Sequence, residues 1–157
     1  MFLNENYNPY QAIDFYASQE LHNFLKLYAA TSGDEVSEDG STSKTFNRQI
    51  DGWLLSAAFG AADFVLSEPL EEIKQSVKVI SGQVLKGNIS AISFLSNLAI
   101  GLTGDVEIVR DPRKVVKIAS ICAESGYLRL KEAMNTGSLV PPAITLATHL
   151  AEAAEDL

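Results

Sequence analysis

Two stretches of the chain are apolar on nearly every side of the helix that each would form. They are residues 53–66, with the sequence WLLSAAFGAADFVL, and residues 89–102, with the sequence ISAISFLSNLAIGL. A helix that is apolar all round is a buried helix, and both stretches are shorter than the roughly 18–20 residues that span a bilayer. The pattern therefore predicts two central helices in an all-α domain, over about residues 45–66 and 88–103.

More amphipathic segments predict the helices that surround this pair. Asn8 followed by Pro9 is typical of a helix start, and Gly87 is typical of a helix end. The segment that follows Asn8, the segment that ends at Gly87 and the later segments repeat apolar residues at intervals of three and four. The expected surrounding helices cover about residues 8–30, 67–87, 111–134 and 141 to near the C-terminus, and residues 105–110 are expected to form an extended connector.

The order of these segments favours one domain over residues 1–157, a bundle of five to six helices joined mostly by short connections. Residues 31–44, TSGDEVSEDGSTSK, are polar and acidic and almost lack an apolar anchor. We expect them to form a mobile acidic loop. We also expect residues 1–7 to form a flexible N-terminal arm.

The overall charge narrows the choice of partners. The net charge is −8 at pH 7, and both nucleic acid and anionic membrane surfaces favour an excess of Lys and Arg. We therefore expect neither as the main partner.

Cys122 is the only cysteine, so no disulfide can form within the chain. The first residues lack a basic segment followed by an apolar one, and a cytoplasmic location is expected.

Chemistry-bearing motifs are sparse. His22, His149 and Cys122 are the only histidines and cysteine, which leaves no cluster for a zinc site. Phosphate-binding glycine loops, calcium-binding loops and nucleophile-elbow motifs do not occur. We expect no metal and no cofactor, and Cys122 lies in an apolar segment that favours a core position. The sequence thus gives no catalytic residues and favours a protein that is not an enzyme.

A polar stripe on the second central segment leaves two interpretations open. Ser90, Ser93, Asn97, Gly101 and Gly104 fall at helical spacing on an otherwise apolar helix, and Ser56, Gly60 and Asp63 do something similar on the first. In the first interpretation, the small residues allow close helix packing. In the second, the stripes line a cavity or an interface with another subunit. The alternative function is therefore a small-molecule-binding bundle or enzyme. Its pocket would lie between the two central helices, around Asp63, Ser93 and Asn97.

Basic residues gather where the helix after residue 110 begins. Arg110, Arg113, Lys114 and Lys117 form this group, and acidic residues lie among them. Cations near unpaired helix N–H groups can bind a phosphate or a carboxylate. The alternative is a solvated surface on which these charges pair with one another.

Aromatic residues crowd the first part of the chain, and there are too many for one buried stripe. Exposed aromatic side chains are typical of interfaces. The candidate contact residues are Phe2, Tyr7, Tyr10 and Tyr16. Together with the acidic charge and the missing catalytic motifs, they predict a non-enzymatic, acidic protein-interaction module. Such a module would act as a homo-oligomer, an adaptor or an inhibitor of another protein.

Overall fold

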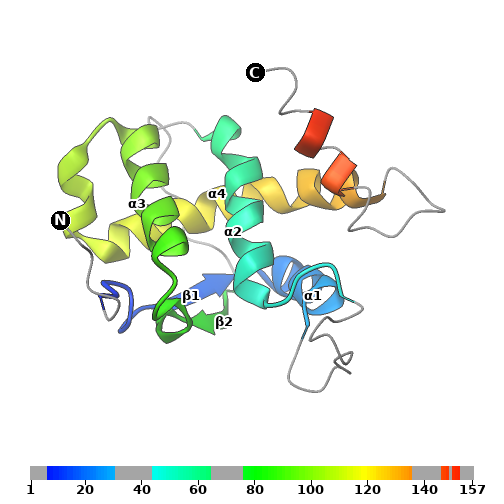
Figure 1. Ribbon diagram of the computed structural model, residues 1–157, viewed down its shortest axis with the longest axis horizontal. Coiled ribbons are helices and arrows are strands. Elements are labelled where there is room, and N and C mark those ends of the chain that lie inside the picture. Colours follow the sequence, from blue (N-terminus) through cyan, green and yellow to red (C-terminus); the bar gives the residue numbers. More distant parts are fainter. Residues whose placement is uncertain (1–6, 31–43, 65–75, 136–145, 149, 153–157) are drawn as a thin grey trace.

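The structure is a computed structural model that describes residues 7–30, 44–64, 76–135, 146–148 and 150–152 (Figure 1). It is mostly helical, as predicted, but the described residues also include a small antiparallel sheet. The main elements are β1 (Asp14–Ala17), α1 (Gln19–Tyr28), α2 (Gln49–Gly60), β2 (Val77–Ser81), α3 (Ile89–Thr103) and α4 (Pro112–Asn135), with short 3-10 turns η1 (Ala61–Asp63), η2 (Gly82–Leu85) and η3 (Val106–Arg110).

The long helix α4 is the centre of the fold, and α2 and α3 cross it side by side (Figure 1). The closest packing joins α2 to α4. A Cβ placed on Gly60 would overlap the carbonyl oxygen of Cys122, and one on Gly126 would overlap the carbonyl oxygen of Ser56. Both crossing positions therefore require glycine, because the two backbones touch there. The close-packing interpretation of Gly60 is confirmed.

The predicted pair of central helices is only half right. The partner of α2 in the core is α4, while α3 buries only Ala91, Ile92, Leu95 and Ala99. The small and polar stripe of α3 points away from the core, with Asn97 and Gly101 exposed. A Cβ on Gly101 would meet nothing within 4 Å. Close packing therefore explains the small residues of α2 and leaves those of α3 without a role inside the described fold.

The helix predicted from Asn8 is wrong at its start. The side-chain oxygen of Asn8 accepts a hydrogen bond from the N–H of Tyr10 at 3.1 Å, which makes a turn instead of a helix cap. Residues Asp14–Ala17 then form β1, and α1 begins after Ser18, whose hydroxyl accepts from the N–H of Leu21 at 3.1 Å. The aromatic residues Phe15 and Tyr16 favour a strand once a partner strand is available.

That partner strand replaces part of the helix predicted over residues 67–87. β2 pairs with β1 so that Phe15 lies opposite Ile80 and Tyr16 opposite Lys78. β-branched residues are stiff and favour strands, and the run Val77, Val79, Ile80 supplies three of them. Gly87 does adopt the positive φ expected of it, +74°, but it follows η2 and not a long helix. Residues 65–75 lie outside the described residues.

Of the remaining predicted boundaries, some match the structure and others do not. α3 and α4 closely match their predicted ranges, whereas residues 106–110 form η3 and not an extended connector. α2 starts at Gln49, later than predicted, because Phe46 is extended: its N–H donates to the carbonyl of Tyr28 at 2.9 Å. The predicted acidic loop and N-terminal arm lie almost wholly outside the described residues, as does much of the last predicted helix.

Candidate functional site

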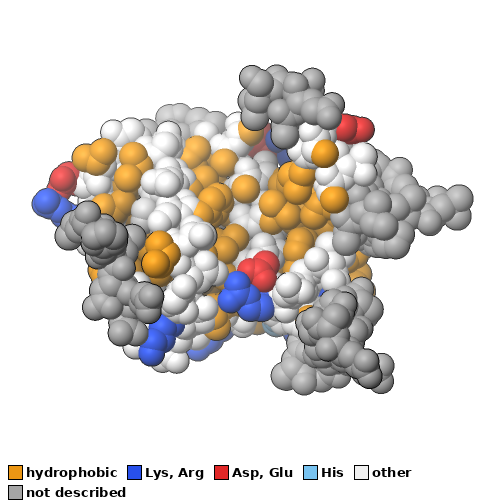
Figure 2. Space-filling view, viewed as in Figure 1, with side chains coloured by type: hydrophobic (Ala, Val, Ile, Leu, Met, Phe, Trp, Pro, Cys, Tyr) orange, Lys and Arg blue, Asp and Glu red, His pale blue; other side chains and the backbone are white. Residues whose placement is uncertain are grey.

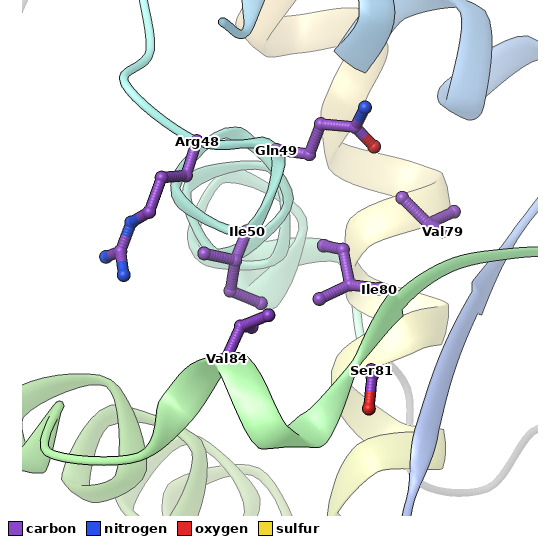
Figure 3. A pocket seen from close by; sticks show the side chains of 7 residues that line it. All are labelled: Arg48, Gln49, Ile50, Val79, Ile80, Ser81 and Val84. Carbon is purple, nitrogen blue, oxygen red and sulfur yellow. The ribbon is translucent and has the colours of Figure 1, made fainter. Parts of the chain in front are cut away.

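An open groove lies between the first turn of α2 and strand β2 (Figure 3). Its volume is about 310 Å³. Ile50 and Ile80 are buried at its base, while Val84 is 43% exposed at its end. Figure 3 shows these three side chains converging between the two walls. The full lining is Arg48, Gln49, Ile50, Val79, Ile80, Ser81 and Val84.

Strand pairing fixes the wall that β2 contributes. β1 pairs with β2, and no residue of β1 lines the groove. The register is irregular because Phe15 and Tyr16 are neighbours while their partners Ile80 and Lys78 are not. Val79 is therefore an extra residue, and such a bulge re-aims side chains at the edge of a sheet.

The far end of the groove is held by contacts from the N-terminal segment. The amide of Asn8 donates to the carbonyl of Gly82 at 2.9 Å, and the N–H of Gly82 donates to the carbonyl of Ile13 at 2.8 Å. A Cβ on Gly82 would overlap the carbonyl oxygen of Tyr10, so this approach also needs glycine. These contacts position η2, and with it Val84.

One basic side chain, Arg48, lines the groove. Arg48 forms a two-point contact with Asp51, at 2.8 and 3.2 Å, and its side chain is 49% exposed. Lys78 pairs with Asp14 at 2.9 Å, and Lys86 is exposed just after η2. Exposed pairs of this kind contribute little stability, about 0–1 kcal/mol. Arg48 can therefore exchange its partner Asp51 at small cost.

A broader apolar surface lies over α2 and α3. Figure 2 shows apolar side chains gathered over these helices on one face, with few charged side chains among them. Leu54, Leu55 and Phe59 of α2 and Phe94 of α3 are only partly buried. The groove opens at the N-terminal end of α2.

The predicted contact residues separate into core and surface. Tyr10 is 1% exposed, its hydroxyl lies 3.2 Å from that of Ser96, and burial raises its pKa. Its ring packs the core and is not available to another molecule. Tyr7 and Tyr16 are 51% and 43% exposed, and Phe2 lies outside the described residues. A contact role for Tyr7 and Tyr16 stays a prediction.

The structure does not bring the predicted pocket residues together. Asp63 forms an ion pair with Arg129 of α4 at 2.8 Å. Ser93 and Asn97 lie on the outward side of α3, and none of the three lines the groove of Figure 3. Their role in binding stays a prediction.

The basic residues near the start of α4 are exposed and partly paired. Arg110 contacts Glu107 at 2.6 Å, and Lys114 contacts Asp111 at 3.7 Å. The carboxylate of Asp111 also accepts from the N–H of Lys114 at 3.3 Å, so it occupies the place at the helix end that a bound anion would take. Arg113 and Lys117 are exposed on the same helix. Binding of an anion here stays a prediction.

Other chemistry finds little support in the described part of the chain. No group of three or more His, Cys, Asp or Glu residues there could hold a metal ion. Cys122 is buried, and burial raises the pKa of its thiol to about 11, which keeps it protonated and unreactive at neutral pH. Among the helices of the described residues, none combines the length and the apolar character that crossing a membrane requires.

Comparison with known proteins gives no match to a family model, to a curated protein or to a solved structure. The groove residues Arg48, Val79, Ser81 and Val84 were not among the predicted sites. The sequence predicted a helix here; the β-branched run around Val79 is the signal that could have indicated a strand, and the pairing with β1 shows it.

Proposed function

We propose that this protein is a non-enzymatic protein-interaction module that holds a segment of another protein in the groove between α2 and β2. The observation that supports the proposal is the groove itself. It is apolar at its base, open at Val84 and bordered by the exposed Arg48. Recognition sites combine apolar surface with a few polar groups at the rim in this way.

A photo-reactive amino acid placed at residue 84 tests the proposal in the host cells of the protein. We expect a cross-linked product of defined mass, since Val84 is exposed and at the groove. The matched control carries the same amino acid in place of Leu128, which is 52% exposed on α4 and does not line the groove. Equal products from both positions, or none from residue 84, would contradict the proposal.

A further inference from the structure

We propose that two copies of this chain associate through the outward side of α3, with the two helices antiparallel and Asn97 at the two-fold axis. This inference goes beyond the proposed function, because no residue of α3 lines the groove. It comes from three features of this side of the helix, namely its apolar flanks, its lack of charge and the chemistry of its polar groups.

The outward side of α3 has a small, polar centre between two apolar flanks. Asn97 and Gly101 are exposed, and Ser93 lies one turn before Asn97 in the same row. Phe94 and Ile100 stand three residues before and after Asn97, so they flank this row on opposite sides, and both are half-buried. Figure 2 shows apolar side chains over α3 with few charged ones among them. An apolar helix face in this position is typical of an interface.

The lack of charge favours a second copy as the partner. α3 contains no Asp, Glu, Lys or Arg over its 15 residues, although 20% of the chain is charged. The exposed side of a helix normally carries such residues. Without them, no like charges meet when this side of two copies comes together, and a charged partner finds nothing to pair with. The net charge of −8 opposes association, but physiological salt screens it beyond about 8 Å.

The polar groups of this side can pair with their own kind. The amide of Asn and the hydroxyl of Ser each donate and accept hydrogen bonds. Ser96 and Thr103 donate to carbonyls of their own helix, at 3.2 and 2.7 Å. Within the described part of the chain, the side chains of Ser93 and Asn97 have no hydrogen-bond partner. They therefore remain available to the equivalent groups of another copy.

Two-fold symmetry fixes which residues meet. Asn97 lies near the middle of α3. An antiparallel pair centred on it places Ser93 against Gly101 of the partner subunit, because each lies four residues from the centre. A row of small residues four apart forms a groove that lets two helices approach closely, and a Cβ on Gly101 meets nothing within 4 Å.

The expected dimer is weak, because the contact is small. A helix of 15 residues is about 22 Å long, and one such helix on each side gives less than the roughly 1,600 Å² of a standard interface. The chain should therefore be monomeric at the micromolar concentrations of an unfolding measurement.

Sedimentation equilibrium of the full chain tests the association. We expect a reversible dimer at about 0.1–1 mM chain, which becomes tighter as NaCl screens the repulsion between the copies. Asn97→Lys should weaken the dimer at least about tenfold, because two equal charges then meet at the axis. The matched control is Leu128→Lys at an exposed position of α4. It changes the net charge equally and should alter the dissociation constant by less than about twofold.

Two further variants test the geometry. Asn97→Lys and Asn97→Asp should each be monomeric alone, and their mixture should dimerise again, because opposite charges then meet at the axis. Gly101→Leu should weaken the dimer without any change of charge, because its side chain would hold the two backbones apart. Both positions are exposed, so the monomer keeps its fold, and circular dichroism of each variant checks this.

Three results would overturn the proposal. They are a chain that stays monomeric at millimolar concentration, equal weakening of the dimer by Asn97→Lys and Leu128→Lys, and a mixture of the two Asn97 variants that stays monomeric. A different protein that binds α3 would appear as the first of these results. None of them affects the cross-link from residue 84, so the proposed function is tested separately.

Discussion

At the scale of single residues, Gly60 and Gly126 set the distance between the two helices of the core. Each lies where a Cβ would overlap the backbone of the opposite helix. The hydroxyl of Ser56 donates to the carbonyl of Gly52 in its own helix at 2.8 Å. It therefore needs no hydrogen-bond partner on the opposite helix. Backbone contact at this point lets the surrounding side chains pack without gaps.

Gly126→Ala should therefore be strongly destabilising. The added methyl group has to push two backbones apart, and because overpacking typically costs about 1–3 kcal/mol, a loss at the upper end, about 3 kcal/mol, is expected. The measurement is the midpoint of urea unfolding followed by circular dichroism. Gly101→Ala is the matched control, because its Cβ meets nothing within 4 Å. It should be neutral or stabilising by roughly 0.5–1 kcal/mol, since Ala favours a helix over Gly. Similar midpoints for both variants would show that the crossing is not tight.

At the scale of elements, α3 is defined more by its ends than by its burial. The side-chain oxygen of Asn88 accepts from the N–H of Ala91 at 3.0 Å, and Gly104 ends the helix with φ of +69°. An asparagine cap and a left-handed glycine are typical helix-ending devices. A helix that buries only one side depends on such caps more than a fully buried helix does.

Asn88→Ala should destabilise the protein by about 1 kcal/mol, because the first turn of α3 loses the acceptor for one of its N–H groups. Thermal unfolding measures the change. Asn97→Ala lies on the same helix at an exposed position and removes the same side chain. It should change stability by less than about 0.5 kcal/mol. A larger effect at residue 97 than at residue 88 would mean that the cap is not formed.

The attachment of α1 to α4 should respond to alkaline pH. Tyr127 on α4 donates to the carboxylate of Glu20 on α1 at 2.9 Å, and burial and this carboxylate raise the pKa of Tyr127 to about 12. The folded state thus favours the neutral phenol. Its contribution is complete below pH 10, the ordinary pKa of tyrosine, and is lost as the pH rises from 10 towards 12.

Tyr127→Phe tests this attachment. The variant should be less stable by about 1 kcal/mol at neutral pH, and the difference from the original chain should shrink above pH 10. Urea midpoints across the alkaline range give the comparison. Cys122, whose pKa is raised to about 11, titrates in both proteins and cancels. A difference that stays constant up to pH 12 would contradict the assigned contact.

The contrast between these elements shows what sequence patterns can predict. α3 and α4 carry their boundaries locally, in Asn88, Gly104 and Pro112, and their ranges were predicted well. β1 and β2 depend on each other across 60 to 67 positions. β2 resembled one side of a helix because Val77, Ile80 and Val84 also fit helical spacing. The groove depends on this pairing, so the sequence alone did not reveal it.

At the scale of the whole molecule, the buried apolar residues of the described segments form one cluster. Trp53, the only tryptophan, lies in it and meets the ring of Phe15 edge-to-face at a centroid distance of 5.0 Å. Its fluorescence therefore reports on the junction of α2 with β1, while circular dichroism reports on all helices.

Urea unfolding followed by these two signals should give coincident transitions, because a shared core unfolds cooperatively. Both curves are recorded on the same samples. Loss of the fluorescence signal at clearly lower urea would show that the end of the molecule with the sheet unfolds separately from α3 and α4. If the two transitions coincide, they also give the free energy of unfolding with which the variants above are compared.

The crossing of α2 and α4 has a consequence for how fast the chain folds. Ser125, beside Gly126, contacts Gly60 from 65 positions away in the sequence. Bringing such distant segments together costs chain entropy before any contact compensates for it. Neither helix can use a side chain to guide the encounter at the two glycines. We therefore predict that the search for this backbone contact contributes to the folding barrier.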